Sequence, residues 1–144
     1  MKIRITAILI EEEKILLIEQ DVSSQRKYSL PGGTLEEDET IYECLKREIK
    51  EETGLEIEPS RLLYICDRIM PEMHVLHITF EVKRIGGQLR ETGTMRDTKP
   101  IHSARMIPLD ELKDCGFSER FYQLAKKNFP DAGTYKGRIE NIGL

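Results

Sequence analysis

The stretch GTLEEDETIYECLKREIKEETGL, residues 33–55, carries the strongest fold signal in this chain. It holds eight of the 26 acidic residues within 23 positions, against three basic ones. Residues 40–43 fit a capping box, and Gly54 stands where a left-handed cap would end a helix. These signals predict a helix over residues 41–53. Before it, Pro31-Gly32-Gly33 predicts irregular backbone, because Pro restricts φ and Gly tolerates positive φ.

The predicted helix places its acidic and basic residues on different faces. At about 100° per residue, an apolar stripe is formed by Ile41, Leu45 and Ile49. Glu48 and Glu52 overlap or border that stripe, Glu51 lies beside Glu48, and Lys46 and Lys50 lie on the far side. Carboxylates that lose water need a partner, and a hard divalent cation such as Mg²⁺ or Mn²⁺ can supply it. A simply solvated acidic helix is the alternative that these residues leave open.

The rest of the chain alternates strand and turn signals. Strands are predicted over residues 2–10, 14–19, 55–57, 62–69, 74–84 and 101–107, and a second helix over 118–128. Residues 20–27 and 88–98 are typical of loops, Gly86-Gly87 of a turn, and the last dozen residues carry no clear signal. Without repeats or linkers, this order predicts one mixed α/β domain over residues 1–144.

Composition excludes several classes of protein. A net charge of −4 and a pI near 5.5 argue against a stable nucleic-acid complex. The longest apolar run is too short to span a bilayer, and early charges argue against a signal peptide. The three cysteines are widely spaced and lack a Cys-x-x-Cys pair, which indicates reduced thiols in a cytoplasmic protein rather than a disulfide framework or zinc site. They are Cys44, Cys66 and Cys115.

The acidic stretch resembles the Nudix box of the Nudix hydrolases at every specified position. The matching residues are Gly33, Glu39, Arg47-Glu48-Ile49, Glu51-Glu52 and Gly54-Leu55, and Leu30-Pro31-Gly32 resembles the family's usual approach to the box. The resemblance implies an α/β/α sandwich with a mixed β-sheet. It also implies metal-dependent hydrolysis of a phosphoanhydride in a nucleoside diphosphate linked to another moiety, a small nucleotide substrate, and Mg²⁺ or Mn²⁺ as cofactor.

The resemblance also implies a set of metal ligands. Glu51 and Glu52 would be the main ligands, Glu48 a further ligand or a base, and Gly33 and neighbouring backbone would contribute an oxygen. Divalent ions suit this chemistry because they neutralise the charge of a diphosphate and lower the pKa of bound water.

Catalytic roles follow from the same resemblance. Arg47 would hold a carboxylate in position, with Glu39 as the preferred partner. In the family the general base differs among members and often lies in a later loop. Here Glu48 is favoured as the base, and Asp97 and Glu91 stay open as alternatives.

Substrate signals are weaker. Tyr28 stands where the family often has an aromatic residue, so it is a candidate to stack on a base, with core packing as the alternative. Arg68 is a candidate to meet phosphate. Pro71 lies 16 positions after Leu55 and resembles a mark of the family's ADP-ribose pyrophosphatases, although a turn explains it equally well. An oxidised or ordinary nucleoside triphosphate stays open as a substrate.

Two further classes compete with the enzyme. An inactive nucleotide-binding or sensor module of the same fold would be expected to lose one of Glu48, Glu51 and Glu52, and all three are present. A purely structural acidic domain would not be stabilised by Mg²⁺ beyond general salt effects.

Homodimers are common among relatives, and a homodimer stays open for this chain. His74 and His77 are three apart in a predicted strand, face opposite sides and are interpreted as structural.

Overall fold

The structure is a computed structural model that describes residues 1–20, 27–90, 94–96, 99–101 and 103–144. Its strands are β1 (Lys2–Ile8), β2 (Ile10–Glu11), β3 (Lys14–Glu19), β4 (Tyr28–Ser29), β5 (Gly32–Thr34), β6 (Leu55–Met70), β7 (Met73–Gly87), β8 (Thr94–Arg96), β9 (Lys99–Ile101), β10 (Ser103–Pro108) and β11 (Thr134–Arg138). Its helices are α1 (Ile41–Thr53), α2 (Glu119–Lys126) and the 3₁₀ turns η1 (Leu109–Glu111) and η2 (Ile139–Ile142).

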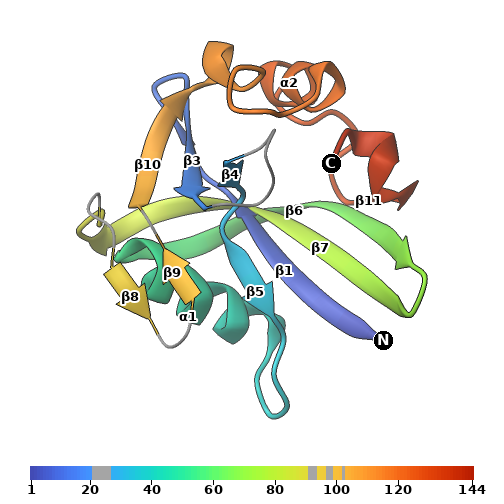
Figure 1. The fold of residues 1–144 in the computed structure, drawn as a ribbon, viewed down its shortest axis with the longest axis horizontal. Coiled ribbons are helices and arrows are strands. Elements are labelled where there is room, and N and C mark those ends of the chain that lie inside the picture. Colours follow the sequence, from blue (N-terminus) through green and yellow to red (C-terminus); the bar gives the residue numbers. More distant parts are fainter. Residues whose placement is uncertain (21–26, 91–93, 97–98, 102) are drawn as a thin grey trace.

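The strands form a large mixed sheet and two smaller sheets. The large sheet has the order β11-β6-β7-β1-β5, in which β1 and β7 run parallel while β6 and β7, and β1 and β5, run antiparallel (Figure 1). A second sheet has the order β10-β3-β2, with β4 also paired to β3, and β8 pairs with β9. Because β5 is at the end of the large sheet, one of its edges faces away from the other strands.

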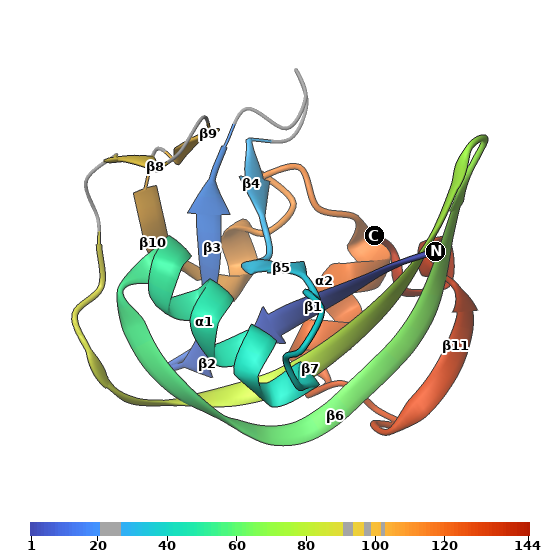
Figure 2. The ribbon, with the colours of Figure 1, turned by 90° about the horizontal axis from the view of Figure 1, so that it is seen from below.

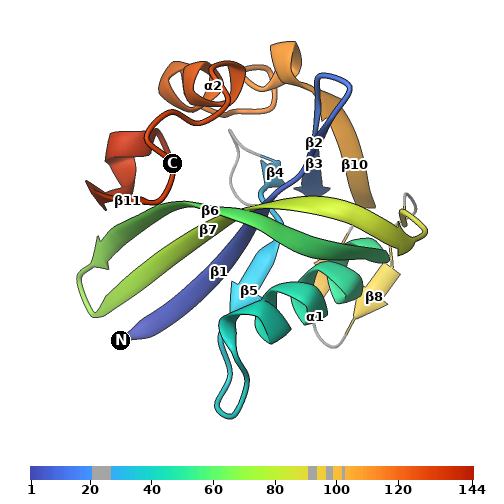
Figure 3. The ribbon, with the colours of Figure 1, turned by 180° about the vertical axis from the view of Figure 1, so that it is seen from behind.

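The two α-helices lie on opposite sides of the large sheet. Figures 1 and 3 show α1 on one side and α2, together with the second sheet, on the other; Figure 2 shows α1 lying along the sheet. The buried face of α1 packs into one hydrophobic cluster through Cys44, Leu45 and Ile49, and α2 packs into a second cluster through Phe121, Leu124 and Ala125. The α/β/α sandwich with a mixed sheet, which the resemblance implies, is confirmed.

The elements with the strongest local signals match the sequence predictions, whereas several longer strands differ. β3 and α1 have the predicted bounds, and the predicted strand over residues 2–10 divides into β1 and β2. The strands predicted over 55–57 and 62–69 are one strand, β6, whose register shifts three times along β7. Gly87 ends β7 opposite Leu55 rather than forming a turn with Gly86. Long-range pairing between β6 and β7 therefore overrides the local turn signal.

The prediction of irregular backbone at the two glycines of the approach is wrong. Gly32 and Gly33 form β5 and pair with Thr6 and Ile5 of β1. Neither glycine has a positive φ. Their importance lies in close approach, since Gly32 packs against the backbone of β1 and Gly33 against a side chain of α1.

The C-terminal part contains more structure than its sequence signals predict. Ser118 caps α2, as the predicted helix requires, but β11 and η2 occupy the region that had no assignment. β11 pairs in parallel with β6, some 70 residues earlier in the chain, and such pairing leaves little local signal. β8 lies inside the predicted loop over residues 88–98.

That residues 1–144 form one domain stays a prediction. Among the described residues, no helix is both long and apolar enough to cross a membrane.

Candidate active site

The position of every carboxylate in the site depends on how α1 begins and ends. Thr40 Oγ1 accepts a hydrogen bond from the Glu43 N–H at 3.1 Å, and Glu43 Oε1 accepts one from the Thr40 N–H at 2.9 Å, which completes the predicted capping box. Gly54 ends the helix with a left-handed φ of 83°. With both ends set, Leu45 and Ile49 are buried and the carboxylates fall along the edge of the helix.

Glu48 lies directly against the edge strand β5. A Cβ atom added to Gly33 would be 2.0 Å from the Glu48 Cδ atom, so the carboxyl group occupies the space that any other residue would fill. The Glu48 side chain is only 17% exposed. Burial is the largest influence on its pKa, which is raised despite the contact with Arg47. Gly33 thus allows a desolvated carboxylate to pack on the strand.

Glu52 lies one turn further along α1 and is hydrogen-bonded to Gly32, the residue before Gly33. Its Oε1 accepts a hydrogen bond from the Gly32 N–H at 2.8 Å. Burial raises the pKa of Glu52 to about 7, and the nearby charges of Glu48 and Glu51 raise it further, while the Gly32 bond and Arg4 oppose the shift. Desolvated carboxyl groups that repel one another favour a bound cation.

Arg47 organises the carboxylates on the outer side of the site. Its guanidinium forms a bidentate pair with Glu39, with Nε–Oε2 at 3.0 Å and Nη2–Oε1 at 2.8 Å. This pair, which the family resemblance implies, holds the pKa of Glu39 down at about 2. Arg47 Nη1 also lies 2.8 Å from Glu48 Oε1 and 3.5 Å from Glu51 Oε2. One planar cation therefore touches three of the acidic side chains at once.

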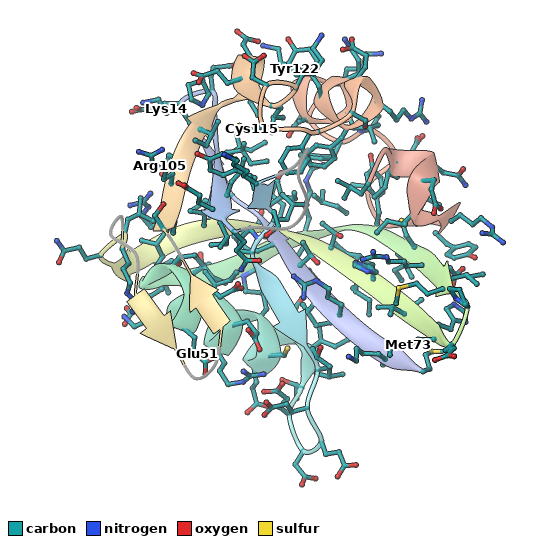
Figure 4. The ribbon with its side chains drawn as sticks, in the orientation of Figure 1. Lys14, Glu51, Met73, Arg105, Cys115 and Tyr122 are labelled. Carbon is teal, nitrogen blue, oxygen red and sulfur yellow. The ribbon has the colours of Figure 1, made fainter. Side chains whose placement is uncertain are left out.

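Glu51 differs from its neighbours in exposure. Its side chain is 47% exposed, against 17% for Glu48. Figure 4 labels it on α1, on the opposite side of the large sheet from Tyr122 of α2. Glu51 is thus open to solvent, whereas Glu48 and Glu52 beside it are largely desolvated.

The donor set fits a hard divalent cation in its chemistry. Glu48 and Glu52 bring carboxylate oxygens to the consecutive residues Gly33 and Gly32, and Glu51 adds a third carboxylate. Oxygen donors of this kind are the ligands that Mg²⁺ and Mn²⁺ prefer. Within the part of the chain that the structure describes, no three His, Cys, Asp or Glu side chains are already grouped to hold a metal ion. In the structure, Arg47 Nη1 contacts both Glu48 and Glu51.

A cleft of about 660 Å³ lies on the other face of the large sheet. Its wall on that sheet comes from β1, β6 and β7, and the opposite wall from the end of β3, from β4 and its neighbour Leu30, and from the C-terminal segment. The lining residues are Arg4, Thr6, Gln20, Ser29, Leu30, Arg68, His77, Thr79, Ile139, Glu140 and Leu144. Arg4 connects the cleft with the carboxylates, because its positive charge lowers the pKa of both Glu48 and Glu52.

The cleft contains a neutral histidine between two arginines. Burial, followed by the charges of Arg4 and Arg68, lowers the pKa of His77 to about 4. His77 is therefore uncharged at neutral pH. Among the described residues, neither arginine has a hydrogen bond or ion pair with another side chain.

The residues that the sequence selects divide between the carboxylate site and the cleft. Arg68 lines the cleft, and its role in binding substrate stays a prediction. Tyr28 does not line the cleft; it packs against the hydrophobic core, and its hydroxyl accepts a hydrogen bond from Arg105 Nη1 at 3.4 Å. The alternative bases Glu91 and Asp97 lie outside the described residues.

Sequence reasoning did not select the polar residues of the cleft floor. On sequence alone His77 is interpreted as structural, and Arg4, Thr6 and Thr79 are not assigned to a site. One signal was available, since Arg4 and Thr6 alternate in β1 with the apolar residues Ile3, Ile5 and Ala7, of which Ile5 and Ala7 are buried. Only the pairing of β1 with β7 shows that Arg4 and Thr6 lie beside the polar residues His77 and Thr79 in the same sheet.

Comparisons with known proteins agree with this architecture. The NUDIX domain family matches residues 1–129. An ADP-ribose pyrophosphatase of Methanocaldococcus jannaschii is 38% identical over 91 residues, which are 61% of this chain and 54% of that protein. The human 8-oxo-dGDP phosphatase NUDT18 is 44% identical over 61 residues, 42% of this chain and 19% of that protein. The matched region thus spans about half, or less, of the length of these relatives.

A solved structure supports the fold independently of close sequence similarity. The crystal structure of a mutator MutT protein from Bacillus halodurans superposes with a TM-score of 0.71 at 21% identity, covering 95% of this chain and 88% of that one. At that identity the likeness concerns the fold alone. Because the family match covers residues 1–129, most of the chain, it shows that this chain belongs to the NUDIX domain family.

Proposed function

We propose that this protein is a hydrolase that cleaves a phosphoanhydride bond in a nucleoside diphosphate derivative and depends on Mg²⁺ or Mn²⁺. One observation carries the proposal: desolvated carboxylates of α1 converge on Gly32 and Gly33 at the sheet edge, beside a cleft large enough for a nucleotide. The carboxylates supply the negative charge that a divalent cation requires. The cleft supplies arginines for the charge of the diphosphate.

The chain's own residues divide the work of this reaction. Glu51, Glu52, Glu48 and the backbone oxygen of Gly33 would hold the cation, which when bound neutralises phosphate charge and lowers the pKa of a bound water. Arg47 would position its carboxylate neighbours, since it contacts Glu48 at 2.8 Å.

Glu48 is the general base that we favour. It lies at the sheet edge, its side chain is mostly buried, and its raised pKa brings proton acceptance closer to neutral pH. Glu39, whose pKa is held near 2, stays ionised and serves to orient Arg47. Arg4 lies on the cleft side and faces the phosphates as a fixed positive charge.

The substrate class is supported by the relatives. Two of them are named as an ADP-ribose pyrophosphatase and an 8-oxo-dGDP phosphatase, so we propose an ADP-ribose-like compound or an oxidised nucleotide. Pro71 adds little to the choice, because it lies in the turn that joins β6 to β7. Met73, labelled in Figure 4, begins β7 directly after that turn.

A substrate panel tests the proposal. Nucleoside triphosphates, 8-oxo-dGDP, ADP-ribose, nucleotide sugars and dinucleoside polyphosphates are incubated with Mg²⁺ or Mn²⁺, and released phosphate and nucleotide are measured. We expect one class to be hydrolysed with a clear advantage in kcat/KM, and activity to vanish with EDTA. If the parent protein hydrolyses none of them with either metal, the enzyme proposal fails and the sensor module becomes the better explanation.

A matched pair of variants tests the site. Glu52→Gln removes a charge at the proposed ligand, whereas Glu72→Gln removes one from the exposed β6–β7 turn. We expect Glu52→Gln to abolish metal-dependent hydrolysis while the fold survives, and Glu72→Gln to leave the rate unchanged. Parental turnover by Glu52→Gln would show that the assignment of Glu52 as a metal ligand is wrong.

A homodimer and a cytoplasmic location stay predictions, which light scattering and cell fractionation can test.

A further inference from the structure

Four polar side chains form a regular arrangement on the floor of the cleft. In the parallel register of β1 and β7, Arg4 is paired with His77 and Thr6 with Thr79. Residues two apart in a strand share a face, so all four side chains project from the same face of the large sheet. We call this set the polar grid. All four of its members line the cleft.

The polar grid contains a buried hydroxyl group that lacks a partner. Thr6 is 5% exposed, and its Oγ1 is the one buried side-chain polar atom without a hydrogen bond among the described residues. The comparison with Thr53 is direct: that buried hydroxyl donates to the Ile49 carbonyl at 2.6 Å and accepts from the Leu55 N–H at 3.1 Å. An unsatisfied buried hydroxyl costs stability, and native proteins rarely keep one without a reason.

The neighbours of Thr6 indicate what kind of group it meets. Thr79 is also buried, at 7% exposure, and its hydroxyl has no hydrogen bond to a described residue. His77 is uncharged at neutral pH, so its ring offers one donor and one acceptor. Three of the four grid residues are therefore neutral hydrogen-bonding groups, and only Arg4 carries charge. A neutral, polar part of a ligand suits such a floor better than a second polyanion does.

We propose that the polar grid determines substrate specificity: Thr6, Thr79 and His77 hydrogen-bond the nucleoside, while Arg4 contacts the adjoining phosphate. This inference rests on the proposed function, because it takes the ligand to be a nucleotide. The position of Arg4 supports it, since its charge reaches both the cleft and the carboxylates Glu48 and Glu52. A nucleotide bound in this way extends from the grid toward the carboxylates.

Thr6→Val is a sharp test because the two side chains have nearly the same shape. Valine removes the unsatisfied hydroxyl, so the variant should be as stable as the parent or more so. The substrate loses a hydrogen-bond partner, so kcat/KM should fall by about 10- to 100-fold, mainly through KM. Thr6→Ser keeps the hydroxyl and should recover most of the affinity. Thr53→Val, which removes a satisfied hydroxyl, should lower the melting temperature.

Binding measured without hydrolysis separates this inference from the enzyme proposal. Isothermal titration with AMP and with GMP, in EDTA, should show binding to the parent protein that Thr6→Val weakens about 10- to 100-fold. Analogues locate the contact: purine riboside 5′-monophosphate lacks the exocyclic group of the base, and dAMP and dGMP lack the 2′-hydroxyl. The analogue that binds Thr6→Val and the parent equally well identifies the group that Thr6 contacts.

Each result has a defined meaning. If Thr6→Val binds AMP and GMP as the parent does, or if neither nucleotide binds the parent, the specificity role is overturned even when hydrolysis is observed. If Thr6→Val loses stability along with binding, the hydroxyl is structural and the inference is again wrong. Weakened binding with an unchanged or higher melting temperature supports the inference even if no substrate of the panel is hydrolysed.

Discussion

The substitution Gly33→Ala should separate catalysis from stability. The added Cβ atom would lie 2.0 Å from Glu48 Cδ, whereas ordinary contact begins at 3.4 Å, so the carboxyl group must move by at least about 1.4 Å. Misplacing a catalytic group by about 1 Å costs on the order of 100-fold in rate. We therefore expect kcat/KM to fall by about 100-fold. The backbone carbonyl oxygen of residue 33, which we propose as a cation ligand, stays in place in this variant.

The effect on stability should be small for a reason visible in the structure. Gly33 does not have a positive φ, so alanine is free of backbone strain, and the clash is with the movable end of a side chain. Alanine also reduces the entropy of the unfolded chain, which favours folding by about 0.4–1 kcal/mol. Loss of the 2.8 Å contact between Arg47 and Glu48 offsets that gain. The net change in unfolding free energy should stay within about 1 kcal/mol.

Gly32→Ala is the matched contrast. Its Cβ atom would lie 2.2 Å from the backbone oxygen of Ile5, which cannot move without disturbing β1. Overpacking of this kind costs about 1–3 kcal/mol or more, so this variant should be clearly destabilised. Urea unfolding gives the stability of both variants, and steady-state kinetics on the best substrate of the panel give their activity. Parental activity in Gly33→Ala, or equal destabilisation of Gly33→Ala and Gly32→Ala, would refute the proposal that the Glu48 carboxyl group acts from its position against Gly33.

Three further outcomes follow from particular contacts. Thr40→Ala removes the α1 cap and should lower the unfolding free energy by about 1 kcal/mol in urea titration; no change would show that the cap contributes nothing. The pKa of His77 is lowered from 6.5 to about 4, so the unfolded chain binds a proton in this window that the folded chain does not. Stability should therefore fall by about 1–2 kcal/mol as the pH drops from 6.5 to 4, since solvent screens this partly exposed ring, and less in His77→Gln. Burial raises the pKa of Cys44 to about 12, so a thiol reagent should label it only after unfolding; fast labelling of the native protein would contradict its burial.

The carboxylate site was predictable because its signals are local. A capping residue, a C-terminal glycine and apolar residues at helical spacing determine where α1 begins, where it ends and which face is buried. The position of Glu48 and Glu52 at the border of the buried face follows from the helical spacing of the apolar residues alone. The pair of Arg47 with Glu39 was expected from the family resemblance, and it is present in the structure.

The cleft was decided by tertiary structure. A strand such as β1 presents two faces, and its sequence does not say what the polar face will meet. The register of β1 against β7 places Thr6 beside Thr79, and the C-terminal segment then covers the same region. The role of Gly32 and Gly33 is of the same kind, since the sequence shows flexible residues and only the packed β5 shows what approaches them. Helix ends and periodicity act over a few residues, whereas strand pairing joins residues some 70 positions apart, and its outcome is chosen by the burial of the whole sheet.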